Sequence, residues 1–169
     1  MDRVYKLLPP GYELRDELRN YALIAAAASA ALLLGFAVIY FGALRDMYYT
    51  DDSGVRQPLA GVSMAPFGGM LIPGKWAFLA ASLVYAALSL RYVGYHYRGG
   101  SRAIYTMRRI PSRGEFIRRC FTLPLLGLAA AQALWRLEAL LCGAVYVFGT
   151  PDMFLPAEPW LGVLLAAAY

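Results

Sequence analysis

Three long apolar segments, at about residues 21–44, 74–95 and 120–148, set the pattern of the chain. As a helix, each can cross the roughly 30 Å hydrocarbon core of a bilayer, because a helix rises about 1.5 Å per residue. The tail at 149–169 ends in ten apolar residues, which are too few to cross and predict a half-helix docked on the outside. We therefore predict an all-α, multi-pass membrane protein with three transmembrane helices in a single membrane domain.

The residues before the first span predict a further helix. Over 11–20, Tyr12, Leu14 and Leu18 lie largely on one side of a helix and the charged residues on the other. This pattern predicts an N-terminal interfacial helix that lies on the membrane surface and turns into the first span. An ordinary solvated helix start has the same pattern and stays open as an alternative.

The segment at 96–119 is a basic loop that predicts a short amphipathic cytoplasmic helix. Apolar residues recur on one helix face over 104–110, and Pro111 ends that pattern. Ser112 and Glu115 then have the S-x-x-E spacing of a capping box, which predicts a new helix that runs into the third span.

Positive charge is concentrated in that loop. From Arg91 to Arg119 the chain has eight arginines and one glutamate, whereas residues 45–75 hold equal numbers of basic and acidic side chains and the tail is acidic. Short loops rich in Lys and Arg stay on the cytoplasmic side. We therefore predict a protein of the plasma (inner) membrane with a cytoplasmic N-terminus and an outer C-terminus.

Composition agrees with a membrane protein, because 60% of the residues are hydrophobic and only 16% are charged. The chemistry-bearing residues predict no enzyme, no cofactor and no metal site. His96 is the only histidine, and Cys120 and Cys142 lie roughly 33 Å apart on one predicted helix, too far for a disulfide. Nucleic acid binding is excluded as well, because the cations lie against a membrane and no recognition module is present.

The stretch IYTMRRIPSRGEFIRRC, together with the amphipathic segment before the first span, resembles the ABC-2 type transporter permeases. In that family an amphipathic helix precedes the first span, and the inner loop between the second and third spans touches the ATP-binding subunit. The matching positions are Tyr12 to Tyr21 and Ser101 to Arg119. The resemblance implies that the loop arginines contact an ATPase, and contact with anionic lipid headgroups is the alternative. These residues are Arg102, Arg108, Arg109, Arg113, Arg118 and Arg119.

The chain departs from that family in its number of spans. ABC-2 permeases usually have six, so three spans predict a half-size permease that needs a partner or a second copy. The chain also lacks a nucleotide site of its own. Gly69 to Lys75 has the G-x-x-x-x-G-K spacing of a phosphate-binding loop, but Trp76 replaces the Ser or Thr that would hold magnesium and no strand precedes it.

The third span carries three polar residues near its middle, Gln132, Arg136 and Glu138. A centred charge costs about 2.5–3.5 kcal/mol to insert. Residues two apart point roughly 200° apart on a helix, so Arg136 and Glu138 do not pair with each other. We predict ion partners on another polypeptide. A substrate or ion pathway, and a tolerated structural charge, are the alternatives.

Small residues predict where helices approach closely in lipid. In the first span they recur every four positions, and in the third they share a face with Arg136. The predicted packing residues are Ala27, Ala31, Gly35, Ala129, Ala139 and Gly143.

The sequence thus predicts a membrane subunit of a transport complex, a half-size permease driven by a separate ATP-binding subunit. Its predicted partners are membrane lipids, that ATPase, and a second membrane subunit or further copies of the chain. A non-transporting scaffold or accessory subunit is the first alternative, and a membrane enzyme is the second.

Overall fold

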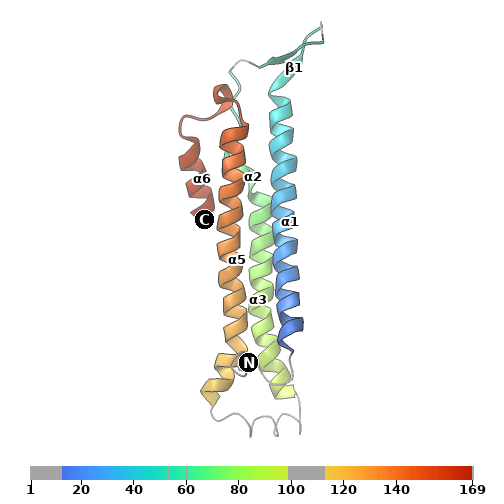
Figure 1. The fold of residues 1–169 in the computed structure, drawn as a ribbon, viewed down its shortest axis with the longest axis vertical. Helices are drawn as coiled ribbons and strands as arrows, with labels where there is room; N and C mark the ends of the chain where they lie inside the picture. The colour runs from blue at the N-terminus through green and yellow to red at the C-terminus, as the bar shows by residue number, and fades with distance from the viewer. Residues whose placement is uncertain (1–12, 53, 60, 99–112, 169) are drawn as a thin grey trace. The chain divides into compact units, whose positions relative to one another are not determined.

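The computed structural model describes residues 13–168 apart from 53, 60 and 99–112 (Figure 1). Over these residues the chain is mostly helical. The long helices α1 (Leu14–Asp46), α3 (Ile72–Arg98) and α5 (Arg113–Gly149) are each long and apolar enough to cross a membrane, as predicted. The shorter elements are the strands β1 (Tyr48–Thr50) and β2 (Arg56–Pro58), helix α2 (Phe67–Met70), the 3-10 turn η2 (Asp152–Phe154) and helix α6 (Pro159–Ala168).

The first helix differs from the prediction of a separate interfacial helix at 11–20. From Leu14 the chain forms one continuous helix of 33 residues, and residues 14–20 are its first turns. No Gly or Pro occurs between Leu14 and Leu34, so nothing breaks the helix where a turn was predicted. Residues 11 and 12, and the predicted short helix over 104–110, lie outside the described residues.

The other long helices begin close to their predicted breaks. Helix α3 starts at Ile72, and Pro73 is tolerated there because the first turn of a helix needs no hydrogen bond from its backbone N–H groups. Helix α5 starts at Arg113, where the capping pattern predicts a helix start, and runs for 37 residues with Pro124 inside it. Its N-terminal end lies before the start of the predicted span of 120–148.

A small hairpin follows α1 and was not predicted in an all-α fold. Strands β1 and β2 pair antiparallel, with Tyr49 opposite Gln57. In the turn between them the Gly54 N–H donates to the Asp51 carbonyl over 2.8 Å, and Gly54 has φ +77°, a conformation that favours glycine. The Asp51 Oδ1 also accepts a hydrogen bond from the Asp52 N–H over 2.7 Å, so this side chain stabilises the backbone of the turn.

The chain forms two compact units, and each of the three long helices contributes to both. One unit comprises Met1–Ala26 and Leu79–Gln132, and the other comprises Ala27–Phe78 and Ala133–Tyr169. We refer to them as the first and the second unit.

Tyr21 is the centre of packing in the first unit. Its ring stacks on that of Tyr85 in α3, with centroids 4.9 Å apart and planes 10° apart, and the Tyr85 hydroxyl donates to the Tyr21 carbonyl over 3.0 Å. Helix α5 reaches the same ring through Gly127, where an added Cβ would lie 2.5 Å from ring carbons of Tyr21. Segments of three helices thus meet at one aromatic side chain.

The second unit packs around a row of α1 side chains that includes Leu32, Phe36 and Tyr40, all buried. Leu32 fills the space that a side chain at Gly74 would need at the start of α3. Phe36 stacks on Tyr40 with centroids 5.4 Å apart and meets Phe67 of α2 edge-on. The Tyr40 hydroxyl lies 3.4 Å from the Thr150 hydroxyl at the end of α5, which links α1 to α5 in this unit.

The contact at Gly127 predicts a specific loss of stability. A methyl group in Gly127→Ala would overpack against the Tyr21 ring and lower the free energy of unfolding by about 1–3 kcal/mol. We expect a lower Tm for the detergent-solubilised protein, followed by circular dichroism. Gly94→Ala in α3 is the matched control, because no heavy atom lies within 4 Å of a Cβ there. Equal Tm values for the two variants would contradict the close approach.

Candidate functional site

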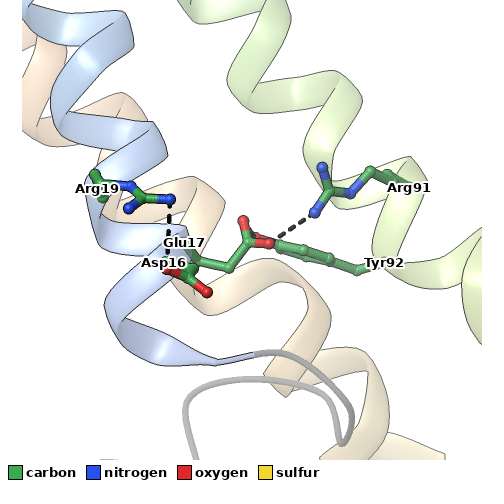
Figure 2. A network of polar contacts seen from close by, with 5 residues as sticks. All are labelled: Asp16, Glu17, Arg19, Arg91 and Tyr92. Carbon is green, nitrogen blue, oxygen red and sulfur yellow. Dashed lines mark hydrogen bonds and ion pairs between the residues drawn. The ribbon is translucent and has the colours of Figure 1, made fainter.

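The best-connected polar cluster lies in the first unit, where α1 and α3 meet at Glu17 (Figure 2). The Glu17 side chain is buried, although it carries a carboxylate. Its Oε1 accepts a hydrogen bond from Arg91 Nη2 over 2.7 Å, and its Oε2 accepts one from the Tyr92 hydroxyl over 2.7 Å. Both carboxylate oxygens are therefore satisfied by one helix of the same chain.

The charges of this cluster balance without leaving a buried ion unpaired. Arg91 keeps half of its side chain exposed and lies 5.7 Å from the centroid of the Tyr92 ring, so it brings a cation to Glu17 while its own charge reaches the surface. Glu17 also lies in the first turn of α1, where the helix dipole favours a negative charge. The nearby pair of Asp16 and Arg19 is exposed and contributes about 0–1 kcal/mol at most.

Two of the predicted loop arginines are described together with their side chains, and they differ in environment. Arg119 forms an ion pair with Glu115 one turn earlier on α5, and both side chains are largely buried. Arg118 is exposed, and only its backbone carbonyl is engaged, by the Thr122 hydroxyl over 2.6 Å. Of these two residues, Arg118 is the one whose side chain is exposed.

The structure describes only one of the remaining loop arginines. Arg113 is the first residue of α5, whereas Arg102, Arg108 and Arg109 lie outside the described residues.

Gln132 is the polar residue of mid-α5 that falls in the first unit. Its Nε2 donates to the Ser82 hydroxyl of α3 over 3.3 Å, and its side chain is exposed. This hydrogen bond joins α3 to α5 in that unit.

In the second unit, Arg136 and Glu138 point in opposite directions, as their spacing predicts. Arg136 is exposed and makes no hydrogen bond or ion pair within the described part of the chain. Glu138 is buried at 8% exposure, and its Oε2 has no hydrogen-bond partner among the described residues. The two side chains are therefore not a pair within this chain.

Glu138 lies at the level of the first turn of α3. The Phe78 ring meets the Trp135 ring with centroids 5.6 Å apart, while Phe67, eleven residues earlier, meets Tyr146, so this part of the chain runs antiparallel to α5. Glu138 follows Trp135 by three residues, about 4.5 Å along the helix, which brings it level with the start of α3.

The predicted packing residues fall into two groups. Gly35 closely approaches Pro73, Gly143 closely approaches Val163 of α6, and Ala139 is fully buried. Ala31 is half-buried, whereas Ala27 and Ala129 are exposed. Among these predicted residues, the close approaches within the chain therefore lie in the second unit, whereas Ala27 and Ala129 are exposed.

The Glu17 cluster was missed by the sequence analysis. The pattern over 11–20 places Glu17 on the charged side of an amphipathic helix, and Arg91 is the first residue of the basic segment. A usable signal was present, because Glu17 and Tyr21 are four residues apart and Tyr85 and Tyr92 are seven apart, so each pair shares a helix face. Two such faces on neighbouring helices predict a polar and aromatic contact.

The described residues contain no group of three or more His, Cys, Asp or Glu side chains placed to hold a metal ion. Cys120 and Cys142 are buried free thiols, as the predicted distance between them requires. What the site offers chemically is charge placement: a satisfied carboxylate at Glu17, a buried carboxyl at Glu138 and an exposed cation at Arg136.

The Glu17 cluster predicts a graded loss of stability. Glu17→Ala leaves the buried Tyr92 hydroxyl without its acceptor and is expected to lower the free energy of unfolding by about 1–3 kcal/mol. Tyr92→Phe removes one hydrogen bond and should cost about 0.5–1.5 kcal/mol. Asp16→Ala, one residue away and exposed, should stay within about 0.5 kcal/mol of the unchanged protein. Denaturant unfolding in micelles measures all three, and an equal loss for Asp16→Ala would contradict the cluster.

Comparison of the chain with protein-family models, characterised proteins and solved structures finds no match.

Proposed function

We propose that the chain is a membrane subunit of a larger transport complex, a half-size permease that works with a separate ATP-binding subunit. In this proposal it lies in the plasma (inner) membrane with the start of α5 on the cytoplasmic side. The observation that carries the proposal is the exposed Arg136 in the middle of an apolar helix.

Arg136 is too deep in α5 to reach water from either end. It lies 23 residues after Arg113 and 13 residues before Gly149, roughly 35 Å and 20 Å along the helix axis. Its neighbours Leu137, Leu140 and Leu141 are exposed apolar side chains, a surface suited to lipid or another helix. A cation in that position costs about 2.5–3.5 kcal/mol in lipid, and a polar or acidic partner chain removes this cost.

The transport part of the proposal rests on the continuity of α5. The helix begins at Arg113, five residues before the exposed Arg118, and continues to the residues around Arg136 and Glu138. A force applied by an ATPase at the start of the helix would therefore act on the segment that carries the deep charges. Glu138, whose Oε2 has no partner among the described residues, is the group that such a movement would expose to a substrate or a partner.

A non-transporting accessory subunit is the second candidate, and the packing of the first unit favours it. The Tyr21–Tyr85 stack and the Glu17 cluster join α1 to α3 through contacts that sliding helices would break. Such a rigid unit suits a protein that only holds an assembly together.

The assembly proposal predicts that Arg136 is needed to retain a partner. We expect the tagged Arg136→Leu variant, purified in a mild detergent, to retain at least about tenfold less of its partner chain, which corresponds to roughly 1.4 kcal/mol. Leu137→Ala, an exposed neighbour on the same helix, is the matched control. Quantitative mass spectrometry of the copurified chains, with light scattering for self-association, provides the measurement.

The same purification separates the two candidates. An ATPase among the chains that Arg136→Leu loses, or that Arg118→Glu loses, supports the half-permease. Partners that contain no ATPase favour the accessory subunit. Full retention of every partner by Arg136→Leu would refute the proposed role of this arginine in assembly.

A further inference from the structure

Helix α6 is apolar on all sides, yet only one of its faces is packed against the protein. Its ten residues, PWLGVLLAAA, include no charged side chain. Val163 and Ala167 are buried, while Leu161, Leu164 and Leu165 are 51%, 57% and 53% exposed. A helix with apolar residues all round is typical of burial in a protein core or in a membrane.

The packed face of α6 rests on α5 within the second unit. Trp160 meets Phe148 edge-on with ring centroids 5.8 Å apart, and Val163 occupies the space where a Gly143 side chain would be. As the numbering rises along α6 it falls along α5, so α6 runs back beside the helix that precedes it (Figure 1). The glycine permits the close approach that helices use in lipid.

The contacts between α1 and the end of α5 show which part of α1 lies at the level of α6. The Tyr40 hydroxyl lies near Thr150, and Gly149 also approaches it, so the end of α5 is level with Tyr40. Tyr40 precedes Arg45, the next charged residue of α1, by five residues, or about 7.5 Å. Because α6 runs from the level of Phe148 past Gly143, it lies at the level of the uncharged stretch of α1 in this unit.

We infer that α6 is a re-entrant half-helix, and that Leu161, Leu164 and Leu165 contact the acyl chains of the bilayer. The inference rests on the membrane embedding in the proposed function but does not depend on transport. At about 15 Å, α6 is half as long as the hydrocarbon core is thick. It enters from the side on which Asp152 and Glu158, both exposed, precede it.

Acyl chains fit this face better than water or a soluble protein does. The exposed leucines of α6 continue the exposed apolar surface of α5 at Leu141, Val145 and Phe148. Trp160 lies at the start of α6 and is 42% exposed. Tryptophan is enriched in membrane proteins at the interface between lipid and water. The order along the chain is therefore acidic residues, an interfacial tryptophan and then apolar residues only, which is the order expected on entering a bilayer.

Site-directed fluorescence quenching tests the placement. In a Cys120→Ala, Cys142→Ala background, Leu164→Cys is labelled with a small thiol-reactive fluorophore and the protein is reconstituted in phosphatidylcholine vesicles. Leu137→Cys on α5 is the reference for lipid, and Gln57→Cys in the hairpin is the reference for water. We expect acyl-chain-brominated phosphatidylcholine to quench the label at 164 as strongly as the label at 137, and iodide to quench it far less than the label at 57.

Each other outcome overturns the inference in a recognisable way. Quenching at 164 by iodide, as at 57, would place α6 in water. Quenching by neither agent would mean that another protein surface covers α6. If iodide quenches the label at 137 as strongly as the label at 57, the membrane embedding itself is wrong, whereas a failure at 164 alone refutes only the re-entrant helix.

A second variant tests the docking on α5. Gly143→Leu would collide with Val163, so we expect it to reduce the quenching of the 164 label by brominated lipid. Gly42→Leu in α1 is the matched control, because nothing lies within 4 Å of a Cβ at that position. Unchanged quenching in Gly143→Leu would overturn the docking of α6 on this glycine.

Discussion

A charged group on an apolar helix needs a compensating partner, and this constraint explains most of what distinguishes the three long helices. Glu17 is compensated within the chain, because Arg91 and Tyr92 supply one donor to each of its oxygens. Glu138 is buried, and its Oε2 has no hydrogen-bond partner among the described residues. Arg136 is exposed among leucines and is compensated by no described residue. Its compensating partner would therefore lie on another chain.

Glycines and one tyrosine determine how closely the helices approach. Gly74 accepts Leu32, Gly127 accepts the Tyr21 ring and Gly143 accepts Val163, so each is a place where a larger residue would collide with a neighbouring helix. In lipid, association between helices depends on such close packing more than on the hydrophobic effect. The aromatic stack of Tyr21 on Tyr85 adds directional contact at one of these points.

The sequence predicted the elements whose signals are local. Apolar length predicted the three long helices, and the capping pattern predicted the start of α5 at Arg113. The sequence did not predict that the proposed interfacial helix is the beginning of α1. This continuity depends on the burial of Glu17 against α3 rather than its exposure at a membrane surface. Likewise, the opposite directions of Arg136 and Glu138 follow from spacing, but which of the two is buried depends on the neighbouring helices.

The position of α6 bears on how Arg136 is tolerated. Arg136 and Gly143 are seven residues apart and so share a face of α5, and α6 covers that face at Gly143. From Val163 to Ala168 the helix descends about 7.5 Å, and from Gly143 to Arg136 α5 descends about 10.5 Å, so α6 ends just short of the arginine. Arg136 therefore lies beyond the part of this face that α6 covers. Helix α6 thus packs on this face at Gly143 and leaves the Arg136 guanidinium open to a partner chain.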